Sequence, residues 1–89
     1  MNKRMLDILA CPMDKKFPLE LYECESESDL IKEGALYCSK CSRFYPIIEE
    51  IPIMLPDELR DKEQDISFLK NNQEKLPEKI INHASPWHL

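Results

Sequence analysis

The sequence predicts a small α+β domain, in which an antiparallel sheet of about four strands is combined with an N-terminal helix and C-terminal helices. Three observations support this fold class. Apolar residues recur at helical spacing near the N-terminus, apolar and polar residues alternate in the middle of the chain, and helix formers dominate after Pro56. The 89 residues suffice for one thin core. We therefore expect a single domain over residues 1–89, with a sheet core at 1–56 and a helical part and tail at 57–89.

A short amphipathic helix is predicted over residues 3–10, because apolar residues there are spaced by three and four. Asn2 can cap its N-terminus through the side-chain oxygen. Pro12 cannot donate a backbone hydrogen bond, so the helix is expected to end just before this residue.

Three strands are predicted in the middle of the chain. The first covers residues 19–24, where apolar and polar residues alternate. The acidic, serine-bearing stretch 23–29 is then expected to form a solvated loop. A second strand over 30–38 is expected to be entered by a turn at 33–34, which holds the single glycine, and a third strand covers 43–47.

A fourth strand is predicted over Ile51–Leu55, after a reversal at Glu49 and Glu50. Pro52 cannot donate to a sheet ladder, so this strand belongs at an edge. Four of its five residues are large and apolar, which makes both of its faces apolar. Burial in the protein's own core would use only one face. We therefore expect the other face or the edge to receive another protein by strand addition.

The last third of the chain is predicted to be helical. Pro56 suits the first turn of a helix, and Asp65 can cap a second helix that covers residues 66–70. Pro77 is expected to open a final short turn. Near the C-terminus, Trp87 is a large aromatic residue, which indicates a tail that docks on the domain.

The charge of the chain argues against direct binding to nucleic acid. The net charge is −5, from 17 acidic and 12 basic residues, and the basic residues form no stripe. Any contact with RNA is therefore expected to be made by a partner. No apolar run approaches the ~20 residues of a membrane helix. A secretory signal is not expected either, because Asp7 interrupts the first apolar run and Pro12 ends it, which favours a cytoplasmic protein without membrane contact.

The cysteines carry the strongest chemical signal. Cys38 and Cys41 form a Cys-x-x-Cys turn, which is half of a tetrahedral zinc site, and Cys11 can supply a third thiolate from a distant turn. Asp14 stands where a complete site has a fourth cysteine, and Cys24 is another candidate ligand. The alternative is a vestigial site, in which the cysteines are small buried hydrophobic residues or form a labile Cys38–Cys41 disulfide. The sequence leaves zinc and an empty site equally open.

Other chemistries are poorly supported. A redox role for Cys38 and Cys41 would require a lowered thiol pKa, but the pair lies between two predicted strands and not at a helix N-terminus. His83 and His88 are close to the C-terminus and far in sequence from the cysteines, which favours a surface or tail position. One glycine cannot build a phosphate-binding loop. The chain is therefore not expected to be an enzyme.

Three segments in combination carry a resemblance to a known family: residues 6–12, 38–47 and 51–55. Together they resemble the small zinc-ribbon activator subunit of archaeal and eukaryotic methyltransferases, best known as the tRNA-methyltransferase activating subunit. The match covers residues 4–59, and 65–81 resembles the C-terminal helical part of that family. The short acidic loop before Cys38 is similar to the archaeal form.

The resemblance implies a non-catalytic subunit that forms a heterodimer with class I S-adenosylmethionine-dependent methyltransferases. Their substrates in this family are tRNA, rRNA and a translation termination factor. The subunit would stabilise each catalytic chain by adding a strand to its central sheet and by covering an apolar patch. The residues that correspond to the partner contacts are Leu9, Phe44, Ile51, Pro52, Ile53, Met54 and Leu55.

The resemblance also implies a zinc site whose four ligand positions correspond to Cys11, Asp14, Cys38 and Cys41. Asp14 departs from the cysteine pattern of the family. Glu50 stands where relatives often have glycine. The competing class of function is a free-standing zinc-ribbon module that binds nucleic acid or a transcription component, and the negative net charge counts against it.

Overall fold

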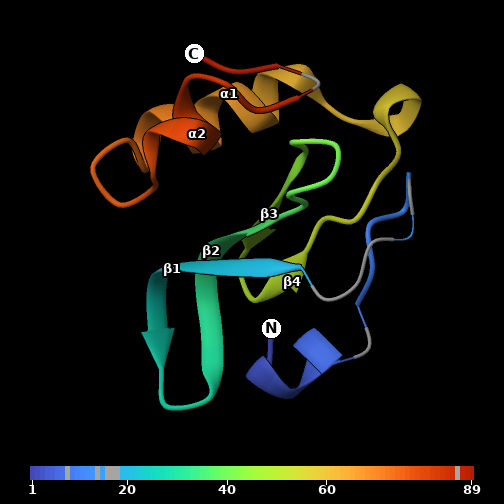
Figure 1. Ribbon diagram of the computed structural model, residues 1–89. Coiled ribbons are helices and arrows are strands. Elements are labelled where there is room, and N and C mark those ends of the chain that lie inside the picture. The colour runs from blue at the N-terminus through green and yellow to red at the C-terminus, as the bar shows by residue number, and fades with distance from the viewer. Residues whose placement is uncertain (8, 14, 16–18, 86) are drawn as a thin grey trace.

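The computed structural model describes residues 1–89 except 8, 14, 16–18 and 86. A four-stranded antiparallel sheet in the order β1-β2-β3-β4 forms the middle of the molecule. The N-terminal segment lies on one face of this sheet, and the helices α1 and α2 lie on the other (Figure 1). The predicted α+β fold with a four-stranded sheet is therefore confirmed.

The first hairpin consists of β1 (Glu20–Glu27) and β2 (Leu30–Tyr37). The stretch 23–29 was expected to be a loop, and this expectation is wrong, because pairing continues to the Glu27–Leu30 pair and only Ser28 and Asp29 form the turn. An edge strand can hold many carboxylates because its side chains are exposed to solvent. The outer half of β1 is indeed exposed from Glu25 onward.

Gly34 lies inside β2 and not in the turn predicted at 33–34, which is a second correction. The reason for glycine at this position is steric. A Cβ atom added to Gly34 would lie 2.6 Å from the backbone oxygen of Tyr22 on β1. The neighbouring pairing is irregular, because the register shifts between Glu23 and Glu25 and leaves Cys24 unpaired, as in a β-bulge. The glycine therefore permits close contact between two backbones.

The second hairpin joins β3 (Phe44–Ile48) to β4 (Ile51–Pro52) through the predicted turn at Glu49 and Glu50. Both turn residues have positive φ, 50° and 73°, as in a type I′ hairpin. The register places Pro52 opposite Ile47 on the edge strand, so the edge position predicted for Pro52 is confirmed.

β4 is shorter than the predicted strand over Ile51–Leu55. The Ile53 N–H still donates to the Pro46 oxygen of β3 at 2.8 Å. Pro46 has no N–H with which to complete the pair, so regular pairing ends there. Residues 53–56 continue as an irregular linker towards the helical part of the chain.

The N-terminal segment forms a 3-10 helix, η1 (Lys3–Asp7), where an amphipathic helix over 3–10 was predicted. Asn2 caps it as expected, because its Oδ1 accepts a hydrogen bond from the Arg4 N–H at 2.9 Å. The helix is short because the chain around it is tied to the sheet: the Lys3 N–H donates to the Asp29 oxygen at 2.8 Å.

The helical part contains η2 (Asp57–Leu59), α1 (Lys62–Asn71) and α2 (Glu78–Ile81). Pro56 precedes η2 and Pro77 precedes α2, as the sequence predicts. No helix in the described part of the chain is long and apolar enough to span a membrane.

Each face of the sheet has its own apolar cluster. The cluster below α1 and α2 consists of Ala35, Tyr37, Phe44, Phe68, Leu69, Leu76, Ile80, Ile81 and Ala84. The cluster on the opposite face consists of Met1, Cys11, Leu19, Ile31, Leu36, Cys38, Tyr45 and Ile47. Neighbouring residues of a strand point to opposite faces, so Phe44 and Tyr45 on β3 belong to different clusters.

Asp65 does not cap a helix, which corrects a third prediction. The cap of α1 is Asp61, whose Oδ1 accepts the Gln64 N–H at 3.1 Å. Asp65 is buried in the first turns of α1, where its Oδ2 accepts from the Arg60 Nε at 2.9 Å and from the Trp87 Nε1 at 3.0 Å. Burial raises the pKa of the Asp65 carboxyl, while the attraction of Arg60 opposes this rise. The contact confirms that the tail docks through Trp87.

We expect Asp65→Asn to destabilise the protein by about 3–5 kcal/mol, because the Arg60 guanidinium would lose its buried counter-ion. Because the amide has nearly the same size as the carboxyl, the loss of stability reports the removal of the charge and not a change in packing. Urea unfolding at pH 7 measures it. Glu63→Gln removes an exposed charge from the same helix and should change the stability by less than about 0.5 kcal/mol. Equal midpoints for the two variants would contradict the structural role of the pair.

We also expect Gly34→Ala to destabilise the protein by about 1–3 kcal/mol, because the added Cβ would force β1 and β2 apart at the Tyr22 carbonyl. The same urea measurement applies, with Ser39→Ala in an exposed turn as the control. A stabilising effect of Gly34→Ala would show that the two strands separate without cost.

Candidate metal centre and sheet edge

The fold brings three of the predicted metal ligands together. The Sγ atoms of Cys11, Cys38 and Cys41 all lie within 4.8 Å of one another. Cys11 and Cys38 are buried, and Cys41 is half-buried. The Cys11 and Cys41 sulfur atoms are 3.7 Å apart. Two turns that are far apart in sequence therefore face each other at one point, as the cysteine spacing predicts.

The two turns have the same backbone geometry. The Lys15 N–H donates to the Cys11 oxygen at 2.8 Å, and the Ser42 N–H donates to the Cys38 oxygen at 2.8 Å. Lys15 and Ser42 both have φ of 62°. In each turn the chain thus closes over four residues after the first cysteine. Asp14, the predicted fourth ligand, lies outside the described residues.

Hydrogen-bond donors surround the sulfur atoms. The Tyr45 hydroxyl lies 3.0 Å from the Cys11 Sγ. Burial, and then this contact, raise the pKa of the Tyr45 hydroxyl well above its ordinary value. The hydrogen bonds to Asp57, and then that to Cys41, raise the pKa of the Arg43 guanidinium. Groups that hydrogen-bond to sulfur in this way orient the sulfur atoms as ligands of a metal.

The separation between two of the three thiols matches that in a tetrahedral zinc site. With Zn–S bonds of about 2.3 Å, two sulfur ligands of a tetrahedral ion lie about 3.8 Å apart. The separation of 3.7 Å between Cys11 and Cys41 agrees with this value. Bound zinc would link the two turns, as structural zinc sites do.

Cys24 is not part of this centre. It packs against the cluster below α1 and α2, on the other face of the sheet. Burial raises the pKa of its thiol to about 11. All four cysteines of the chain are free, so the structure does not contain a Cys38–Cys41 disulfide. His83 and His88 are exposed, with ring centroids 6.4 Å apart, and they are not among the groups that can share a metal in the described residues.

The predicted partner residues fall into two groups. Leu9 and Met54 pack against the cluster that contains Cys11, on the same side as β4. Ile51 is 60% exposed, and residues 52–55 are half-buried. Phe44, in contrast, is fully buried and stacks on Phe68 of α1 with ring centroids 6.3 Å apart. A direct partner contact at Phe44 is therefore excluded while α1 covers the sheet.

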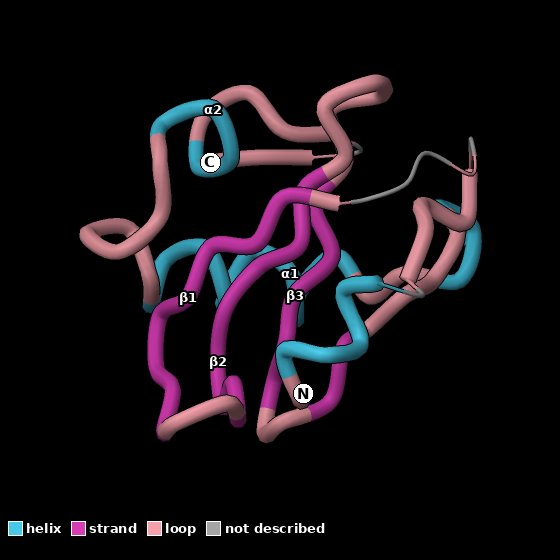
Figure 2. Tube along the Cα trace, turned by 60° about the horizontal axis from the view of Figure 1, so that its bottom comes forward, coloured by secondary structure: helices cyan, strands magenta, loops and turns pink. Residues whose placement is uncertain are grey.

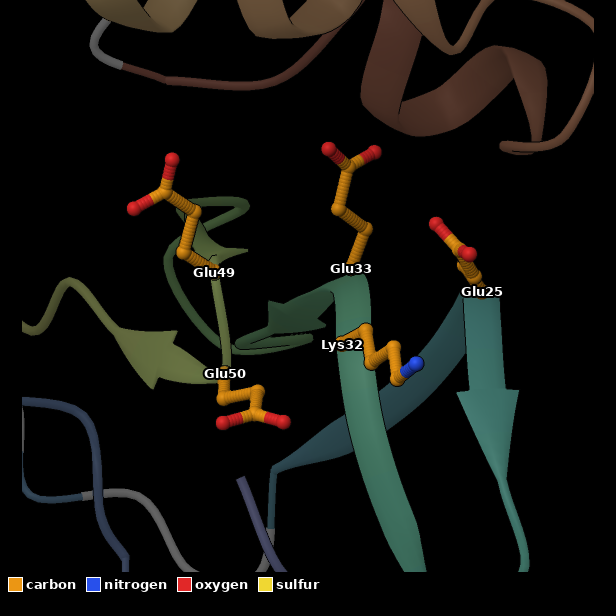
Figure 3. A pocket seen from close by; sticks show the side chains of 5 residues that line it. All are labelled: Glu25, Lys32, Glu33, Glu49 and Glu50. Carbon is orange, nitrogen blue, oxygen red and sulfur yellow. The ribbon is translucent and has the colours of Figure 1, made fainter.

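An acidic hollow of about 350 Å³ lies beside the second hairpin turn (Figure 3). It is lined by Glu25, Lys32, Glu33, Glu49 and Glu50. Lys32 pairs with Glu27 at 3.2 Å and leaves the carboxylates of the lining in excess. This surface repels phosphate, in agreement with the lack of nucleic-acid features in the sequence.

The sequence reasoning missed two exposed residues. Leu59 on η2 is 63% exposed, and Met13 in the first cysteine turn is 41% exposed. The helix predicted after Pro56 does not indicate whether the Leu59 side chain faces the core or the solvent. Arg60 was also missed, although its side chain is only 2% exposed.

A small antiparallel sheet and two cysteine turns that converge on one point define a domain of the zinc-ribbon class. The sequence profile described as Trm112p-like protein matches residues 2–50, which is more than half of the chain. The chain belongs to the Trm112p-like family.

Curated relatives and a solved structure agree with this assignment. A protein from Dechloromonas aromatica, named UPF0434 protein, is 42% identical over 65 residues, which cover 73% of this chain and 97% of that protein. A UPF0434 protein from Nitrosococcus oceani is 37% identical and is covered completely by 74% of this chain. The Haloferax volcanii Trm112 methyltransferase activator, in a complex with a candidate methyltransferase, aligns with a TM-score of 0.64 and 40% identity over 67% of this chain and 100% of that one.

These relatives are shorter than this chain. They are covered almost completely by 67–74% of it. The family profile ends at residue 50, before η2, α1 and α2. These helices thus lie outside the part of the chain that the profile matches.

We expect the purified protein to contain about one equivalent of zinc, as a site with three converging thiolates predicts. Cys41→Ser should lose most of this zinc, because serine oxygen is a poor ligand for the ion. Cys24→Ser is the matched control and should retain it, since Cys24 lies on the other face. Elemental analysis of the folded proteins measures the content. Equal zinc in both variants, or none in the wild-type chain, would contradict the assignment.

Proposed function

We propose that this protein is a non-catalytic subunit that binds and stabilises the catalytic chain of a methyltransferase. The observation that carries the proposal is the open edge of the sheet at β4, where an exposed isoleucine precedes a proline. The Haloferax volcanii relative, whose whole length matches this fold, is a methyltransferase activator that was solved in a complex with a candidate methyltransferase. The same role in this chain accounts for an apolar edge without any catalytic constellation among the described residues.

The β4 edge is suited to strand addition. Ile51 pairs with Ile48, and the Ile53 N–H points to β3. The alternation of an antiparallel ladder then turns the Pro52 carbonyl away from β3, towards an incoming strand. An exposed apolar edge is an aggregation hazard unless another chain covers it. A strand of the partner would pair with β4 along this edge and would also bury the Ile51 side chain.

The other edge of the sheet is protected. β1 carries glutamates at positions 20, 23, 25 and 27, and the last three are exposed. Lys79 pairs with Glu20 at 2.8 Å and Lys3 pairs with Glu23 at 3.0 Å. Charged side chains on an edge strand discourage pairing with another chain. Strand addition at β4 is therefore favoured over addition at β1.

The finer assignment rests on the family resemblance. We infer that the partners are class I S-adenosylmethionine-dependent methyltransferases that modify tRNA, rRNA and a translation termination factor. They form a heterodimer with this chain in the cytoplasm. RNA is reached through the catalytic subunit, since the net charge of −5 and the acidic hollow disfavour contact between this chain and phosphate. Zinc, when bound, has a structural role.

We expect co-expression with the host's class I methyltransferases to increase the soluble yield of at least one of them and to give a stable one-to-one complex. Ile51→Asp should weaken that complex by about 30-fold or more, the effect of a central interface residue. Ile51 is exposed, so the variant should fold like the wild type. Ser67→Asp adds the same charge on the outer face of α1 and should bind normally. Failure of the wild-type chain to bind any methyltransferase would refute the proposed function.

A further inference from the structure

Three large apolar side chains are exposed in the described part of the chain: Met13, Ile51 and Leu59. Only Ile51 belongs to the strand discussed above. None of the three lies on the helices that cover the other face. An isolated exposed apolar residue is ordinary on a protein surface, but a continuous group of them marks a contact site.

Ile51 and Leu59 lie at the two ends of one segment, which runs from β4 through the linker to η2, and Met13 lies in a second segment. Figures 1 and 2 show the segment after Cys11 beside the linker that connects β4 to η2. The linker residues Ile53–Pro56 are half-buried, so their apolar atoms are partly accessible along its length. We call this surface the β4–η2 ridge and define it by Met13, Ile51, the linker and Leu59.

We propose that the β4–η2 ridge is a second contact surface for the methyltransferase chain, with Leu59 as its anchor. It fits an apolar depression of the partner that lies beside the strand added at β4 and is bordered by Lys and Arg. The proposal rests on the proposed function, and it extends the contact beyond the strand.

Leu59 is held rigidly although it is exposed. The Arg43 Nε and Nη2 donate to the two carboxylate oxygens of Asp57 at 2.9 and 2.6 Å, which fixes the first residue of η2. The Leu59 N–H donates to the Pro56 oxygen at 3.0 Å. The next side chain, Arg60, is buried and stacks over the Phe44 ring with its central carbon 4.8 Å from the ring centroid. The backbone on both sides of Leu59 is thus held in place, by the Arg43–Asp57 pair before it and by buried Arg60 after it, while the Leu59 side chain is exposed to solvent.

Such pre-organisation favours binding, because little side-chain or backbone freedom is lost when the partner arrives. The packing of this chain does not require leucine at this position, since the side chain contributes little to either cluster. A polar residue would serve the fold equally well. The exposed leucine is explained if another molecule covers it.

The two ends of the ridge at Ile51 and Leu59 have acidic neighbours in the chain. Glu49 and Glu50 lie in the turn before β4, and Glu58 and Asp61 lie on either side of Leu59; all four are exposed, while Lys15 is exposed near Met13. An apolar strip with an acidic border is complementary to an apolar depression with a basic border. This charge pattern speaks for a basic protein partner and against a second copy of this acidic chain.

The test uses the full-length chain and the methyltransferase that co-purifies with the wild type. Leu59→Lys should weaken the complex by about tenfold or more, and Met13→Lys should weaken it to a smaller extent. Both sites are exposed, so the unfolding temperature should not fall. Ser67→Lys on α1 adds the same charge outside the ridge and should bind as tightly as the wild type.

A second measurement tests whether the partner's apolar depression is bordered by basic residues. Glu58→Lys should slow association several-fold at low salt and have little effect at high salt, because steering by surface charge is screened. An association rate that is unchanged at low salt would refute the basic border.

The outcomes separate the two proposals. If Ile51→Asp disrupts the complex and Leu59→Lys binds like the wild type, strand addition stands and the ridge is wrong. If both variants weaken binding and Ser67→Lys does not, the ridge is supported. If the wild-type chain binds no methyltransferase, both proposals are wrong.

Discussion

The buried guanidinium of Arg60 joins the parts of this small protein. It stacks over Phe44 and Tyr45, which lie on opposite faces of β3, and pairs with Asp65 of α1. Trp87 of the tail lies over the same group and shares the Asp65 carboxylate. The two terminal nitrogens of the Arg60 guanidinium are buried without a hydrogen-bond partner among the described residues. A charge in this position is tolerated because aromatic faces and one carboxylate surround it, and removal of any of them leaves it uncompensated.

This arrangement explains how the chain differs from its shorter relatives. The matched part of these relatives corresponds to about two thirds to three quarters of this chain, and the family profile ends at residue 50. In this chain, the layer beyond the profile contains α1, α2 and Trp87. That layer seals the sheet face which includes Phe44. One face is thereby closed within the chain itself. The apolar surface that stays accessible is on the side of β4, which is where the proposed partner would bind.

The sequence correctly predicted the position of a residue in the fold where the chemistry of that residue type permits few structural roles. Cysteine spacing placed Cys11 near Cys38 and Cys41, and Pro52 marked the edge strand because proline cannot donate to a ladder. It failed where tertiary contacts decide. Gly34 looks like a turn residue but is needed for the close approach of Tyr22. Asp65 resembles a cap, yet Arg60 and Trp87 hold it in the core. Phe44 was assigned to the partner surface because no pattern shows that α1 covers it.

The cysteine centre and the proposed partner surface share a structural element, the short segment that contains Arg43. Its carbonyl accepts the Cys38 N–H at 2.8 Å, and its side chain fixes Asp57 at the start of η2. A change in the cysteine turn would be transmitted to Leu59 through one residue and one bidentate ion pair. A metal bound by the cysteines would hold the second cysteine turn in place and, through Arg43 and Asp57, also the start of η2. Under the proposed function, a structural metal would thus support the contact with the partner without taking part in a reaction.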